Sequence, residues 1–169
     1  MSLWDDANQR AQAETAQARS EDQAHADLIA LQRRELTEFK EAMTRLGVPT
    51  MQFSLHGWLR RNSQDSNNVK SKESVNGWAI ATWAGYSYST DFSTPKNATY
   101  HLVLTPDLAV YDTENQHVTN GTFGKKWKIA PRALPITNIN LDAVPGSTWQ
   151  NPPTLSDTLR ITLAAHMQR

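Results

Sequence analysis

Apolar residues near the start of the chain follow the spacing of a helix. Four of them share one helical face at intervals of seven, three and four: Ile29, Leu36, Phe39 and Met43. No Gly or Pro interrupts the stretch between Trp4 and Gly47, which is rich in Ala, Gln, Glu and Arg, and these residues favour helix. The pattern predicts one long helix, which defines a first segment over residues 1–47.

Both ends of this helix carry sequence signals. Ser2 and Asp5 have the spacing of a capping box at the N-terminus. At the other end Gly47 can adopt the left-handed conformation, Val48 can pack back on the last turn, and Pro49 cannot continue the helix. The helix is therefore expected to stop at Gly47.

The N-terminal half of the helix has little apolar surface, which comes from Trp4, Ala7, Ala11 and Ala18. More than forty helical residues span about 60 Å, longer than the width of a domain built from the rest of the chain. We therefore expect self-association, as in a coiled coil, or docking of a partner protein. The residues expected to bind that partner are Trp4, Ala11, Ile29, Leu36, Phe39 and Met43.

An alternative places a break in the helix. Ser20, followed by Glu21 and Asp22, could cap a second helix, so that the N-terminal region would fold as an αα-hairpin.

The rest of the chain, residues 48–169, is predicted to form a β-rich domain. Apolar and polar residues alternate from Met51 to Leu59, as in a half-buried strand. Residues 61–77 contain hardly any apolar side chain and predict a flexible loop. Strand-like residues 100–104 and 108–111 flank Pro106 and Asp107, which suit the centre of a type I turn. We expect an antiparallel sheet of about five or six strands.

The C-terminal third predicts an extended segment followed by a short helix. Five prolines occur between Pro131 and Pro153, which favours an extended path. Over residues 154–167, Leu155, Leu159, Leu163 and Met167 recur every four positions, as in a helix, whereas an alternation around Leu159 also permits a strand. Together these segments define an α+β fold with a long N-terminal helix.

Charge and composition restrict the possible partners. The chain has 17 basic and 17 acidic side chains and no cysteine, so disulfides and thiol chemistry are excluded. Residues 1–50 carry a formal charge of −3 and residues 51–169 a charge of +3, which is far from a nucleic-acid footprint. The sequence has neither an apolar run long enough to span a membrane nor a basic, apolar leader. A cytoplasmic protein without a membrane partner is expected.

No catalytic or metal-binding motif stands out, and no cofactor is expected. The five histidines are scattered singly, without the spacing that places two imidazoles on one metal. A site assembled in three dimensions from His56, His101 and Asp107 is one possibility, and solvent-exposed or hydrogen-bonded histidines are the other.

Six tryptophans are many for this length. Aromatic side chains on an open sheet face could stack on a single-stranded nucleic acid or a small ligand. The candidates for such a face are Trp58, Trp78, Trp83, Trp127 and His101. Alternatively, the same side chains build the core, because each buries more area than Leu.

Three functions follow as hypotheses. The first is a non-catalytic interaction protein that acts through the N-terminal helix, the second a binding module with an aromatic face, and the third a small enzyme with a site near His56, His101 and Asp107. The sequence favours the first.

Overall fold

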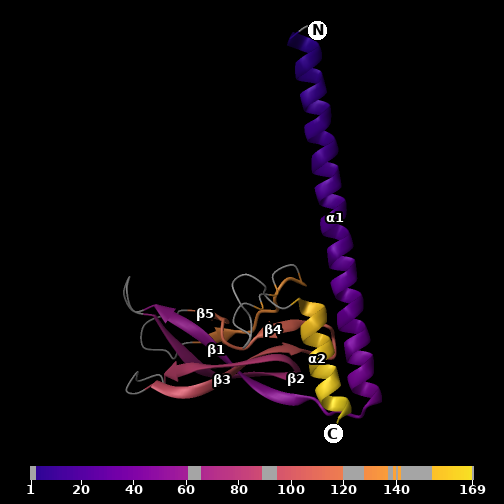
Figure 1. The fold of residues 1–169 in the computed structure, drawn as a ribbon. Coiled ribbons are helices and arrows are strands. Elements are labelled where there is room, and N and C mark those ends of the chain that lie inside the picture. The colour runs from indigo at the N-terminus through magenta and orange to yellow at the C-terminus, as the bar shows by residue number, and fades with distance from the viewer. Residues whose placement is uncertain are drawn as a thin grey trace.

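The computed structural model describes residues 3–60, 66–88, 95–119, 128–136, 139, 141 and 154–168. It confirms the α+β fold, with a long helix that projects from a smaller body (Figure 1). The elements are α1 (Leu3–Arg45), β1 (Met51–Arg60), β2 (Ser66–Tyr88), β3 (Pro95–Leu104), β4 (Val110–Asp112), β5 (His117–Thr119), β6 (Lys128–Ala130) and α2 (Leu155–Met167).

Helix α1 ends as its sequence predicts. Gly47 has a positive φ of 67°, and its N–H donates to the carbonyl of Thr44 at 3.0 Å. The N–H of Val48 donates to the carbonyl of Met43 at 3.0 Å. These two bonds form a Schellman motif, which satisfies carbonyls that the helix itself leaves free.

The helix continues without a break through Ser20 and its neighbours, so the αα-hairpin alternative is wrong. Ala, Gln and Glu on both sides of Ser20 propagate a helix well. One serine is too weak a stop signal against that background.

The sheet has the antiparallel order β1-β2-β3-β4, and β5 and β6 form a separate two-stranded sheet. The 23-residue strand β2 joins two hairpins. Its first half pairs with β1, from Met51 opposite Gly77 to Arg60 opposite Ser66, and its second half pairs with β3. The turn between β3 and β4 is the predicted one, since the N–H of Leu108 donates to the carbonyl of Thr105 at 3.0 Å.

The expectation of a loop over residues 61–77 is wrong for residues 66–77, which lie in β2; residues 61–65 lie outside the described residues. Polar side chains can occupy this strand because its pairing with β1 depends on backbone hydrogen bonds. Cross-strand polar contacts add to it, and Gln52 Nε2 donates to Ser74 Oγ at 2.7 Å.

The sheet curls until β1 approaches β3. Thr113 closes the gap, because its N–H donates to the carbonyl of His101 on β3 at 2.9 Å and its own carbonyl accepts from the N–H of His56 on β1 at 2.7 Å. Next to this contact, a Cβ on Gly57 would lie 2.5 Å from Val118 Cγ2 and 2.8 Å from the carbonyl oxygen of Gln116. Only glycine fits this approach.

The main core lies between the helices and one face of the sheet. Its buried residues are Leu36, Phe39, Met43, Trp78, Ile80, Ala81, Trp83, Tyr100, Leu102, Leu104, Val110, Leu141, Leu155 and Leu159. Polar contacts join the end of α1 and α2 to the sheet: Trp78 Nε1 donates to the carbonyl of Val48, just after α1, at 2.9 Å, and Thr162 Oγ1 of α2 donates to that of Ile80 at 3.0 Å.

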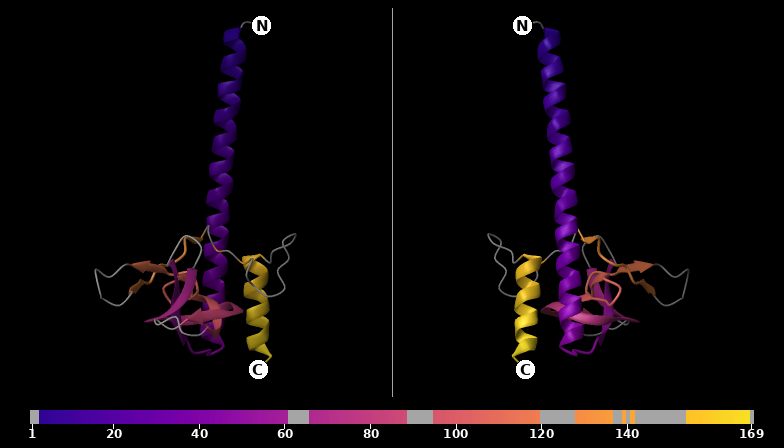
Figure 2. Two further views of the ribbon diagram at one scale, coloured as in Figure 1. Left: turned by 90° about the vertical axis from the view of Figure 1, so that its left-hand side faces the viewer. Right: turned by 90° about the vertical axis from the view of Figure 1, so that its right-hand side faces the viewer.

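The C-terminal segment is helical, so the strand alternative for residues 154–167 is wrong. Thr154 caps α2, and its Oγ1 accepts from the N–H of Asp157 at 3.1 Å. Leu155 and Leu159 are buried against α1 and the sheet. Figure 2 shows α2 beside the lower part of α1, with both helices running in the same direction.

Candidate functional site

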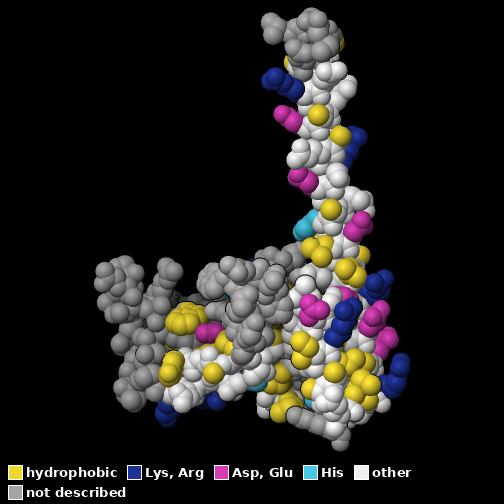
Figure 3. Space-filling view, viewed as in Figure 1, with side chains coloured by type: hydrophobic (Ala, Val, Ile, Leu, Met, Phe, Trp, Pro, Cys, Tyr) yellow, Lys and Arg dark blue, Asp and Glu magenta, His cyan; other side chains and the backbone are white. Residues whose placement is uncertain are grey.

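The most unusual surface of the molecule is the first part of α1, residues 4–28, which we call the projecting segment. Every described side chain in it is exposed. At 1.5 Å per residue it extends about 37 Å. In the space-filling view it stands clear of the body, and the face shown carries polar and charged side chains with small hydrophobic ones between them (Figure 3).

The projecting segment is held in helix by local bonds only. Gln17 Nε2 donates to Glu21 Oε1 at 2.9 Å, and Gln23 Nε2 donates to Asp27 Oδ1 at 2.8 Å, both pairs four residues apart on one helical face. An isolated helix must first form a costly nucleus. Here the buried second half of α1 supplies that nucleus, so the projecting segment only extends a helix that already exists.

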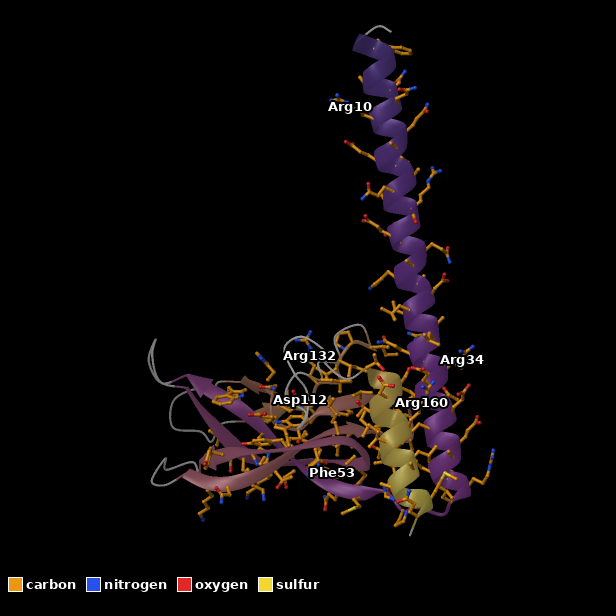
Figure 4. All side chains as sticks on the ribbon, viewed as in Figure 1. Arg10, Arg34, Phe53, Asp112, Arg132 and Arg160 are labelled. Carbon is orange, nitrogen blue, oxygen red and sulfur yellow. The ribbon has the colours of Figure 1, made fainter. Side chains whose placement is uncertain are left out.

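Charge on the projecting segment is mainly negative. It contains six acidic residues and two basic ones, a formal charge of −4 with histidine neutral. Its two large apolar side chains lie at its ends, where Trp4 is 72% exposed and Leu28 is 47% exposed, and the apolar side chains between them are alanines. Arg10, one of the two cations, points away from the helix into solvent (Figure 4).

The six residues expected to bind a partner fall into two groups. Trp4 and Ala11 are exposed on the projecting segment, and Ile29 is half-buried where that segment ends. The other three, Leu36, Phe39 and Met43, are buried in the main core of the same chain. We call residues 29–45 the docked segment. Its apolar stripe packs on α2 and the sheet, so Leu36, Phe39 and Met43 have no exposed surface for another chain.

The tryptophans expected on an open sheet face are mostly internal. Trp78 and Trp83 are buried in the main core, and Trp83 Nε1 donates to Glu114 Oε2 at 2.7 Å. Trp58 is exposed, and Trp127 lies outside the described residues. Tyr86, another aromatic side chain of β2, is 64% exposed.

The Trp83–Glu114 contact belongs to a buried polar network. Burial raises the pKa of the Glu114 carboxyl, with a smaller contribution from Asp112 nearby. Burial also raises the pKa of the Tyr100 hydroxyl, which donates to the carbonyl of Tyr86 at 2.5 Å. The two hydrogen bonds connect β2 to the segment after β4 and to β3.

The structure brings His56 and His101 together and leaves Asp107 apart. Both histidines line one hollow of about 390 Å³, which we call the histidine hollow. Asp107 does not line it and instead accepts a hydrogen bond from Thr105 in the β3–β4 turn. The triad suggested by the sequence is therefore not assembled. Among the described residues, no group of three His, Cys, Asp or Glu side chains could hold a metal ion.

Both imidazoles have a lowered pKa. Burial is the main cause for His56, and the positive charge of Lys70 lowers its pKa further. Burial alone lowers the pKa of His101, whose Nδ1 lies 3.0 Å from Thr82 Oγ1 and whose ring lies 4.7 Å from that of Phe53. Both side chains are therefore held neutral more readily than a free histidine.

Comparison with known proteins adds no family. No protein-family model matches the chain, and neither a curated protein nor a solved structure shows significant similarity to it. Within the described part of the chain, neither α1 nor α2 is long and apolar enough to cross a membrane.

Proposed function

We propose that this chain is a non-catalytic interaction protein, in which the body anchors α1 and the projecting segment binds another protein. One observation carries the proposal: the chain maintains about 37 Å of helix whose described side chains are all exposed. A helical segment whose side chains are all exposed contributes nothing to the core of its own chain. Its surface is therefore available for a partner.

Charge favours a second protein with a basic surface over a second copy of the same segment. Two projecting segments side by side would bring two formal charges of −4 together, and like charges oppose association. A basic partner surface would instead be attracted, with an association rate that falls as salt rises.

Self-association remains the second candidate, and Trp4 and Leu28 favour it. Exposed apolar side chains at both ends of the segment could seat against a neighbouring helix.

The first test is the mass in solution by light scattering, for the full chain and for a variant lacking residues 1–27. These residues contribute nothing to the described core, so the variant keeps its fold. An oligomer that becomes monomeric after the deletion would show that the projecting segment binds a second copy of the chain.

If both forms are monomeric, photo-crosslinking tests whether the projecting segment binds a different protein. A crosslinker in place of Ala18 should give a discrete adduct with a protein partner in native extract, and Glu21→Lys with Asp22→Lys should abolish it. The control is a crosslinker at Glu41, which is exposed on the docked segment. Monomers without an adduct specific to position 18 would refute the proposal.

A further inference from the structure

The histidine hollow lies where the curled sheet fails to close. Strands β1 and β3 both pair with β2 in antiparallel orientation, so they run parallel to each other. Thr113 joins them at His56 and His101. Beyond that point the two facing edges stay open. Among the described strands, none pairs with the outer edge of β1 over residues 51–55, and none pairs with that of β3 over residues 95–100. The hollow is lined from both edges and from β2.

Cations and neutral hydrogen-bonding groups surround this hollow. Lys70 lies on β2 directly opposite His56, and Lys96 lies on β3 opposite Ser87. Ser54 and Asn97 add neutral polar side chains. None of the described residues that line the hollow is acidic. Two lysines without a lining carboxylate leave a net positive charge in a recess, which attracts anions.

A second, independent feature is the buried imidazole of His56. This side chain is only 5% exposed. The backbone of Ser54 and Thr113 lies close enough to act on its ring, but no group meets its Nδ1 in hydrogen-bond geometry. A buried polar atom without a partner is costly. Its neighbour Lys70 makes the local potential positive. An anion held by Lys70 would offset that potential and favour a protonated imidazole, which is the form that can donate from both nitrogens.

We propose that the histidine hollow binds a phosphoryl group or a similar oxyanion, with Lys70 and Lys96 as the charged contacts. Asn97 and Ser54 supply neutral donors beside them. The Phe53 ring, packed on His101, forms an apolar wall. The volume of about 390 Å³ exceeds a single phosphate and leaves room for an organic group next to it.

The test is an NMR titration of the full chain with inorganic phosphate, observed through the ring C–H signals of His56 and His101. The expected result is a saturable shift together with a rise in both imidazole pKa values. Lys70→Gln and Lys96→Gln should each weaken binding about fivefold, as expected for a solvent-exposed charge pair. Both lysines are exposed, so the variants keep the fold.

Lys72→Gln is the matched control, because Lys72 is exposed on the same strand and does not line the hollow. Its binding should be unchanged. Equal weakening by all three substitutions would show only general surface charge and would overturn the proposal. The absence of a saturable shift in the wild-type chain would also overturn it.

A second arm of the titration distinguishes two possible ligands, a free phosphate ion and an organic phosphate ester. A nucleoside monophosphate that binds more tightly than inorganic phosphate, and shifts the Phe53 ring signals, would identify an organic phosphate ester. Equal affinity would identify the free ion. Both outcomes support the site and are independent of whether the projecting segment binds a protein.

Discussion

The two parts of α1 share one backbone conformation and differ in everything around it. In the docked segment, Leu36, Phe39 and Met43 are buried against α2 and the sheet. In the projecting segment every described side chain is exposed. The difference shows that propensity and capping are enough to define a helix, whereas apolar spacing decides which part of it belongs to the body.

The largest difference in stability between the two segments should come from one Leu→Ala substitution in each, made as separate variants. Leu36→Ala removes a fully buried side chain and should lower the free energy of unfolding by about 2–5 kcal/mol. Leu28→Ala, at an exposed position one segment earlier, should change it by less than about 0.5 kcal/mol. Urea denaturation measures both. Equal effects would mean that the projecting segment is part of the cooperative core.

A smaller effect is expected where the docked segment ends. Gly47→Ala should cost about 1–2 kcal/mol, because a side chain disfavours the left-handed conformation at φ 67°. No atom lies within 4 Å of the added Cβ, so the cost is conformational and not a clash. Gly47→Asn should cost less, since Asn tolerates this conformation. The two variants are compared by thermal and urea unfolding, and equal costs would contradict this explanation.

Acidification should weaken the body through His56 and His101. His56 and His101 have a lower pKa in the folded chain than the ordinary 6.5. Below pH 6.5 the unfolded chain therefore binds more protons, and the free energy of unfolding falls until the pH passes the folded pKa values.

This pH effect is checked by the urea midpoint at pH 7.5 and pH 5.5, with His56→Gln and His101→Gln as comparisons. Each variant should show a weaker pH dependence than the wild type. Glu114 acts in the opposite direction at lower pH, because its raised pKa makes stability fall as pH rises from 4.5 through the folded value. A steeper pH dependence in either histidine variant would refute the assignment.

The smallest effect on global stability should come from Ala16→Gly in the projecting segment. Glycine costs a helix about 1 kcal/mol relative to alanine, but this part of α1 is exposed and adds little to the core. Hydrogen exchange should therefore accelerate over residues 4–28 while the urea midpoint stays constant. Ala42→Gly, the matched change in the docked segment, should lower the midpoint.

Signals confined to a few neighbouring residues were predictable. Gly47 and Pro49 mark the end of α1, and residues 154–167 show the four-residue recurrence of α2. The position of residues 66–77 in β2 was not predictable, because backbone pairing with β1 leaves no apolar pattern. For His56 and His101 the sequence left two possibilities, a shared site or separate exposed or hydrogen-bonded histidines. It could not decide between them, because the two residues are joined through Thr113, which is distant in sequence from both.

The geometry of α1 also has a mechanical consequence. The docked segment, about 25 Å long, holds a free arm of about 37 Å, so a sideways pull at Trp4 acts on the body as a lever with the fulcrum near Ile29. A pull along the helix axis instead loads Leu36, Phe39 and Met43 in shear against α2 and the sheet. The attachment should therefore resist tension along the axis far better than bending.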